Sequence, residues 1–112
     1  MKEITFYQCF RENILNGSKT ITIRDDSEKD FKIGSVIDVF TFEQHQWFAK
    51  IKILAVTPIQ FSQLTEMHAQ QENMTLTELK QVIRQIYPNV EQLFVIHYQL
   101  VSTDGVNERW RQ

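Results

Sequence analysis

The longest strand-like segment of this chain, residues 47–56, constrains the fold more than any other sequence feature. Apolar and polar residues alternate along it, which is typical of a β-strand with one buried face. The residues expected to face inward are Ala49, Ile51, Ile53 and Ala55, and those expected to face outward are Lys50 and Lys52. Pro58 has no backbone N–H to donate and is expected to end the strand. The core is therefore expected to be built around β-structure.

Four shorter segments also have strand-like composition. They are residues 4–6, 20–23, 36–42 and 93–100, and the second of them, Thr-Ile-Thr-Ile, is β-branched throughout. Residues 25–30 are polar and acidic and are expected to form an exposed loop, and residues 43–46 a turn. Strands dominate this pattern and helices are inserted between them. It predicts an α+β fold, a small and partly closed β-barrel, because closure protects the edge strands.

Three segments are predicted to be helical. Apolar residues recur at four-residue spacing over residues 6–15, and Gly17 stands where a C-terminal cap would be. A second helix is expected over residues 62–71. A third helix opens with Thr75 and Glu78, whose spacing is that of a capping box, and continues with apolar residues on one face.

The length of 112 residues suits one domain. We assign residues 1–100 to that domain and residues 101–112 to a polar C-terminal tail. The N-terminus lacks the apolar run of a signal peptide, and no segment approaches the roughly 18 apolar residues of a membrane span. Cys9 is the single cysteine, which excludes an intramolecular disulfide and a cysteine-based zinc site. We therefore expect a cytoplasmic protein that does not bind a membrane.

The charge pattern favours a small ligand. The net charge is −2, and the twelve Lys and Arg residues are thinly spread. Proteins that hold nucleic acid through its phosphates usually carry a basic patch, so no stable nucleic acid partner is expected. The histidines, His45, His68 and His97, have no metal-binding spacing, and the three glycines are isolated. We expect no metal, no cofactor and a monomeric protein.

Residues 17–24 read Gly-Ser-Lys-Thr-Ile-Thr-Ile-Arg and bring hydroxyls and cations together on an otherwise apolar strand. The simpler interpretation is structural, since threonine is favoured in strands. The functional interpretation is a threonine nucleophile with a lysine base. A threonine hydroxyl needs a neighbour to take its proton, and lysine can do so only when its pKa is lowered by burial or a nearby cation such as Arg24.

Strand geometry raises an objection to that pairing. Strict alternation places Thr20, Thr22 and Arg24 on one face and Lys19 on the other. Lys19 and Thr22 can meet only if Lys19 precedes the regular strand, which the preceding Gly17 allows.

A second candidate lies in residues 71–79. Glu78 belongs to the predicted capping box, whereas Glu72 has no such role and lies at the break between two helices. A glutamate there is usually solvated at the surface, but a break between helices also allows the side chain to reach a cleft.

Several runs of residues resemble known families. Ile-Thr-Phe at 4–6 and Ile-Leu-Asn-Gly-Ser-Lys-Thr-Ile-Thr-Ile-Arg-Asp at 14–25 resemble the opening signature of the ASCH domain. Leu-Thr-Glu at 64–66, His-Ala at 68–69, Gln-Glu-Asn-Met-Thr-Leu-Thr-Glu-Leu-Lys at 71–80 and Ile-Tyr-Pro at 86–88 resemble the bacterial N(4)-acetylcytidine amidohydrolase family. The resemblance extends from about residue 4 to residue 100.

This resemblance implies a PUA-like β-barrel with flanking helices and an amidohydrolase that releases acetate from N(4)-acetylcytidine, a small nucleoside. By matching position, Lys19 is implied to be the general base, Thr22 the nucleophile and Glu72 the general acid. Arg24 falls on a basic position of the same signature and is expected to bind substrate. Two alternatives stay open: an RNA-binding PUA-like module without catalytic activity, and an interaction domain that uses Trp47 or Trp110.

Overall fold

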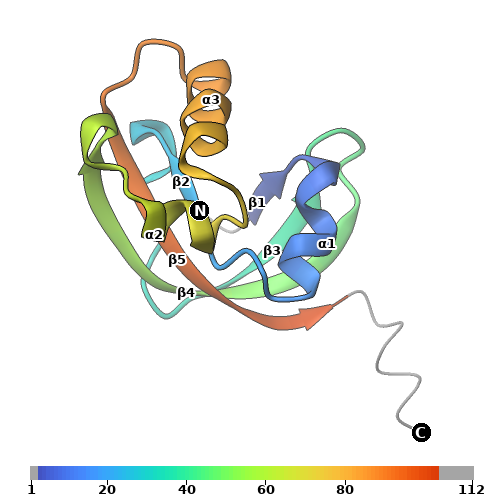
Figure 1. Cartoon of the computed structure of the whole chain (residues 1–112). Helices are drawn as coiled ribbons and strands as arrows, with labels where there is room; N and C mark the ends of the chain where they lie inside the picture. The colour runs from blue at the N-terminus through green and yellow to red at the C-terminus, as the bar shows by residue number, and fades with distance from the viewer. Residues whose placement is uncertain (1–2, 104–112) are drawn as a thin grey trace, which may run out of the picture.

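The computed structural model describes residues 3–103, which form one curved sheet with helices packed on it (Figure 1). The strands are β1 (Glu3–Phe6), β2 (Ile21–Arg24), β3 (Val36–Thr41), β4 (Trp47–Gln60) and β5 (Gln92–Thr103). The α-helices are α1 (Arg11–Leu15), α2 (Glu66–Gln71) and α3 (Leu76–Ile86). Short 3₁₀ turns are η1 (Gln8–Phe10), η2 (Asp26–Glu28) and η3 (Phe61–Gln63). This arrangement confirms the predicted α+β class.

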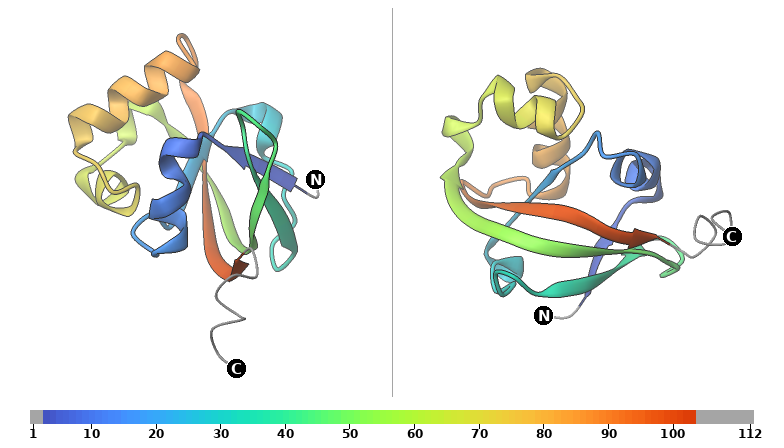
Figure 2. Two further views of the ribbon diagram at one scale, coloured as in Figure 1. Left: turned by 90° about the vertical axis from the view of Figure 1, so that its right-hand side faces the viewer. Right: turned by 90° about the horizontal axis from the view of Figure 1, so that it is seen from below.

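The long strands β4 and β5 form the spine of the sheet, whose strand order is β1-β3-β4-β5-β2. Within it β1 and β3 are parallel and the other neighbours antiparallel. The β4–β5 register shifts between Lys50 and Ile51 and between Ile53 and Ala55. Such irregularities bend a strand, and both strands curve so that the three α-helices lie on one side of them (Figure 2).

The curvature brings the two edge strands, β1 and β2, toward each other. Arg24 of β2 donates from one terminal guanidinium nitrogen to the carbonyl oxygen of Thr5 in β1 at 2.8 Å. A side chain thus bridges the gap that strand pairing leaves open, as expected of a partly closed barrel.

The core consists of two hydrophobic clusters. One contains Ile4, Phe6, Ile14, Phe31, Ile37, Val39, Phe48, Ala49, Ile51, Ile53, Ile96 and Tyr98, and the other contains Ile21, Ile23, Leu64, Ala69, Leu79, Ile83, Leu93 and Val95. Although β2 is an edge strand of the sheet, Ile21, Thr22 and Ile23 are all buried. The polar Thr22 is therefore held in a largely apolar environment.

The predicted end of the long strand at Pro58 is wrong, because β4 continues to Gln60. Pairing with β3 covers β4 only as far as Lys52, so the end of β4 that contains Pro58 pairs with β5 alone. A proline is tolerated there because its missing N–H faces the unpaired side.

Both early helices are shorter than predicted. Residue Phe6 pairs with Thr41 in the sheet instead of starting a helix, so residues 6–15 divide into strand, 3₁₀ turn and α1. The predicted helix over 62–71 likewise divides into η3 and α2. In the first segment sheet pairing outweighs apolar periodicity, and in the second a 3₁₀ turn precedes a shorter helix.

The last strand continues three residues past its predicted end. Ser102 and Thr103 pair with Lys50 and Ala49 of β4, so the segment assigned to a tail begins inside β5. Residues 104–112, which include Trp110, lie outside the described residues. No helix within 3–103 is long and apolar enough to cross a membrane.

Candidate active site

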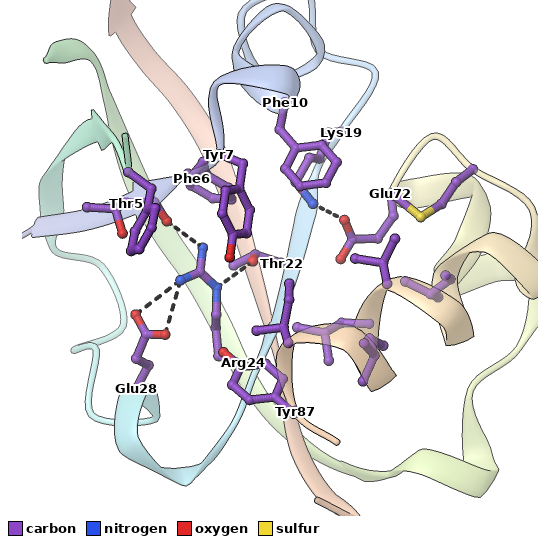
Figure 3. Close-up of a pocket in the computed structure, with 17 residues that line it drawn as sticks. Thr5, Phe6, Tyr7, Phe10, Lys19, Thr22, Arg24, Glu28, Glu72 and Tyr87 are labelled. Carbon is purple, nitrogen blue, oxygen red and sulfur yellow. Dashed lines mark hydrogen bonds and ion pairs between the residues drawn. The ribbon is translucent and has the colours of Figure 1, made fainter. Parts of the chain in front are cut away.

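A pocket opens between β1, β2, η1 and α3 (Figure 3). Its volume is about 180 Å³, far more than the roughly 15 Å³ that holds one water molecule. The polar residues that line it include Thr5, Lys19, Thr22, Arg24, Glu28 and Glu72, and the aromatic ones are Phe6, Tyr7, Phe10, Phe42 and Tyr87. All four predicted site residues therefore lie at one pocket.

Lys19 lies just before β2, as the functional interpretation required. Helix α1 ends at Leu15 with Asn16 as its C-cap, and Gly17 takes a positive φ of 82°, which turns the chain toward the pocket. The backbone of Lys19 is then held by two bonds: its N–H donates to the Asn13 carbonyl, and its carbonyl accepts from the Tyr98 hydroxyl at 2.9 Å. The objection from strand alternation does not apply, because Lys19 is outside the strand.

Glu72 is positioned by the C-terminal turn of α2. The next residue, Asn73, has a positive φ of 60°, and its N–H donates to Gln70 while the N–H of Met74 donates to Ala69. These are the two bonds of a Schellman motif. The turn leaves Glu72 only 6% exposed, which is unusual for glutamate. Asn73 is the sequence signal for this turn, and it did not enter the prediction.

Lys19 and Glu72 meet inside the pocket. The Lys19 ammonium contacts Glu72 Oε1 and also donates to the Ile21 carbonyl at 3.0 Å. The Phe10 ring centroid is 5.0 Å from Lys19 Nζ, and the Phe6 centroid is 5.6 Å away. Burial lowers the pKa of Lys19 well below its ordinary value, and the positive charge of Arg24 lowers it further, against a smaller opposite effect of Cys9.

Two protonation forms of this pair have the same net charge. One contains an ammonium and a carboxylate, and the other contains a neutral amine and a carboxylic acid. Taking two charges out of water is costly, so burial favours the neutral form more than an exposed site would. Neutral lysine is a base and protonated glutamate is an acid, which are the two functions predicted for Lys19 and Glu72.

Thr22 interacts with Arg24. Its side chain is 4% exposed, whereas Thr20 is exposed and outside the pocket. Thr22 Oγ1 accepts a hydrogen bond of 2.8 Å from Arg24 Nε. Lys19 and Thr22 line the same pocket without a direct hydrogen bond, a common state of catalytic pairs in the absence of substrate.

The guanidinium of Arg24 is hydrogen-bonded to several neighbouring residues of the protein. In this respect Arg24 differs from a cation that is free to bind substrate. Besides Thr22 and Thr5, it donates from the second terminal nitrogen to both carboxylate oxygens of Glu28, each at 3.1 Å. Its guanidinium carbon lies 4.8 Å from the centroid of the Phe6 ring. Residues 25–30 were predicted to be an exposed loop, and Glu28 was missed. Glu28 is only half-buried. Its four-residue spacing from Arg24 would predict an ion pair only if both residues belonged to one helix.

An exposed pair of aromatic rings lies at the pocket and was also missed. Tyr7 is 40% exposed and Phe42 60%, and their ring centroids are 5.1 Å apart. Trp47, an alternative interaction residue, instead donates its indole N–H to Asp38 at 2.9 Å. The hydrophobic surface near the site is thus provided by Tyr7 and Phe42.

Comparison with known proteins gives consistent relatives. The ASCH domain family matches residues 3–101. A Vibrio vulnificus protein named N(4)-acetylcytidine amidohydrolase is 56% identical over 99 residues, covering 88% of this chain and 95% of that protein. A Shewanella protein of the same name is 50% identical over 103 residues, covering 92% and 94%.

Solved structures with this fold have low sequence identity to the chain. An Enterococcus faecalis protein superposes with a TM-score of 0.76 at 17% identity, covering 97% of this chain and 81% of that one. An ASCH domain from Lactobacillus crispatus superposes with a TM-score of 0.72 at 18% identity, covering 90% and 80%. These likenesses concern the fold, and they agree with the PUA-like barrel expected from the sequence.

Proposed function

The chain belongs to the ASCH domain family, and from this premise we propose that it is an amidohydrolase that converts N(4)-acetylcytidine to cytidine and acetate. Relatives of nearly the same length, at 50% and 56% identity, bear the name of that activity. The observation that carries the proposal is the burial of a lysine, a threonine and a glutamate around one pocket, at 3%, 4% and 6% exposure. Buried ionisable groups at a cleft are typical of catalytic sites.

The first half of the proposed reaction is acyl transfer to Thr22. The Thr22 oxygen attacks the acetyl carbonyl carbon as its proton passes to the neutral amine of Lys19. The tetrahedral intermediate then breaks its C–N bond, and Glu72 donates a proton to the departing amine of cytidine. For both transfers, Lys19 and Glu72 exchange their mutual contact for contacts with Thr22 and the substrate.

The second half is hydrolysis of the ester on Thr22. A water molecule attacks the acetyl carbon as its proton passes to the Glu72 carboxylate. The tetrahedral intermediate then breaks its bond to the Thr22 oxygen, which regains its proton from the Lys19 ammonium, and the acetyl group leaves as acetic acid, which ionises to acetate. Every proton taken in this cycle is returned, so the reaction needs no cofactor. All three residues belong to one chain, and the proposed enzyme is a monomer.

The pocket wall suits a flat, uncharged base. The Tyr7 and Phe42 rings offer an apolar face at which a pyrimidine can stack. The substrate is a free nucleoside, so recognition is expected to depend on stacking and hydrogen bonds.

The test is an assay of the purified protein with N(4)-acetylcytidine, followed by chromatography for cytidine. We expect Thr22→Ala to lower the rate at least about a thousandfold, as when a catalytic unit loses its nucleophile. Thr20→Ala, the matched control on the exposed neighbouring threonine, should have a far smaller effect. If Thr20 proves to be the essential hydroxyl, or the wild-type protein releases no cytidine, the proposal is wrong.

A further inference from the structure

We propose that Glu28 and Arg24 act together as a positioning unit that orients the Thr22 hydroxyl for attack. The inference rests on the proposed function and adds to it a residue, Glu28, from outside the predicted catalytic set. It also changes the expected role of Arg24 from substrate binding to positioning.

The guanidinium of Arg24 is held at three points. Glu28 binds one terminal nitrogen with both carboxylate oxygens at 3.1 Å, and Thr5 O binds the other at 2.8 Å. The Phe6 ring lies against the guanidinium, with its centroid 4.8 Å from the central carbon. Arg24 and Glu28 are 12% and 24% exposed. All three guanidinium nitrogens donate hydrogen bonds, with Nε donating to Thr22, so the direction of Nε–H is fixed.

This fixed donor restricts the Thr22 hydroxyl (Figure 3). Within residues 3–103, the hydrogen bond of Thr22 Oγ1 is the one it accepts from Arg24 Nε at 2.8 Å. A hydroxyl has one proton and two acceptor positions. Because Arg24 occupies an acceptor position, the proton of Thr22 stays available for transfer to a base. The cation also stabilises negative charge as it develops on the Thr22 oxygen.

The same cation acts on Lys19. Both side chains lie against the Phe6 ring, and the charge of Arg24 contributes to lowering the pKa of Lys19. The groups that face Lys19 from other elements are Glu72 after α2 and Cys9 in η1, while Tyr98 in β5 bonds its backbone. Glu28 weakens the influence of Arg24 on the pKa of Lys19, because its carboxylate partly neutralises the charge of the guanidinium.

The first test separates position from charge with Arg24→Lys. Lysine keeps the positive charge but cannot donate to Thr22, Thr5 and Glu28 together. We expect kcat to fall by roughly 10- to 100-fold, the loss of one charge-assisted hydrogen bond. KM should change by less than about threefold, because the lost bond is made to the nucleophile and not to the ground-state substrate.

The second test uses the pH dependence of kcat. The active lysine–glutamate pair holds one shared proton, so the wild-type rate should follow a bell in pH. Glu28→Gln removes a negative charge, which favours loss of protons from the pair. Both limbs should move to lower pH by roughly half a unit, less than the 1–3 units of a charge in direct contact. Arg24→Gln should move both limbs to higher pH, and Arg24→Lys should leave them in place.

Asp26→Asn is the matched control, since Asp26 lies in the same η2 turn and pairs with the exposed Lys29 at 3.0 Å. Its pH profile should equal that of the wild type. Thermal denaturation should establish that each variant is folded. If folded Arg24→Lys keeps full kcat, or Glu28→Gln moves the bell to higher pH, the positioning unit is overturned. An inactive wild type would instead overturn the proposed function, so the two failures are distinguishable.

Discussion

Two lysine–carboxylate pairs in this chain have the same chemistry and opposite surroundings. Lys19 and Glu72 are 3% and 6% exposed, whereas Lys50 and Asp38 are 46% and 40% exposed with a contact of 2.8 Å. Asp38 and Lys50 are directly opposed on β3 and β4, so strand register alone brings them together. Lys19 and Glu72 are 53 positions apart in the sequence, and each is positioned by the turn of the chain at the end of a helix.

Their surroundings act on protonation in opposite ways. Hydrogen bonds from Lys50 and then Trp47 lower the pKa of Asp38, so the exposed pair favours its charged form. Burial lowers the pKa of Lys19, so the pocket disfavours the charged lysine. The sheet would lose little without the exposed pair, since such pairs contribute about 0–1 kcal/mol. A buried pair that is costly to desolvate points instead to a functional role.

The largest expected difference between the pairs is in activity. Lys19→Arg should lose at least about a thousandfold in kcat/KM, because a guanidinium stays protonated at any workable pH and cannot act as a base. Lys50→Arg, the same exchange in the exposed pair, should leave the rate unchanged. The measurement is the initial rate of cytidine release at several pH values. Substantial activity of Lys19→Arg would rule out the general-base role.

A second, smaller difference is expected in stability. Replacing both members of the buried pair, as Lys19→Met with Glu72→Leu, should keep or raise the free energy of unfolding, by up to about 4 kcal/mol, because no charge is left to desolvate. Lys19→Met alone should be less stable than the double variant, since it leaves Glu72 unpaired. Denaturant titration at neutral pH measures both.

The control is the analogous double replacement of Lys50 and Asp38, which should change the free energy of unfolding by no more than about 1 kcal/mol. If the buried double variant unfolds far more easily than the wild type, the Lys19–Glu72 pair has a structural role, and its burial is no sign of catalysis.

Local features of this site were predictable from the sequence. Thr75 and Glu78 form the expected capping box, in which Thr75 accepts from the Glu78 N–H. Gly17 has the positive φ expected beyond a helix end. Lys19 also meets the condition for facing Thr22, because β2 begins only at Ile21. Each of these depends on a few adjacent residues, whose caps and turns have recognisable spacing.

Long-range features were not predictable in the same way. The burial of Glu72 depends on how the end of α2 meets the chain around Lys19, and periodicity contains no such information. Glu28 was missed for a different reason. Its contact with Arg24, four residues earlier, is local, but residues 25–30 were assigned to an exposed loop from their polar, acidic composition. The PUA-like barrel and the roles of Lys19 and Glu72 came from resemblance to families and not from spacing.

The smallest expected effect is that of salt on substrate binding, and it tests the RNA-binding alternative. Salt screens charges in contact with solvent, such as Lys50 and Asp38, much more than buried ones such as Lys19 and Glu72. N(4)-acetylcytidine carries no phosphate, so its binding releases no condensed counterions. We expect KM to change by less than about threefold between about 50 and 200 mM salt, whereas six to ten phosphate contacts would weaken binding by 10³- to 10⁵-fold.

The decisive form of this test is a competition between the free nucleoside and an acetylated, folded RNA at both salt concentrations. The RNA should be the poorer substrate, because its base must leave the stack at a cost of a few kcal/mol before it can enter the pocket. Preferential turnover of the RNA that fades as salt rises would mean that exposed cations such as Lys50 contribute to recognition. The contrast between a functional buried pair and an incidental exposed pair would then no longer hold, and the nucleoside would not be the substrate.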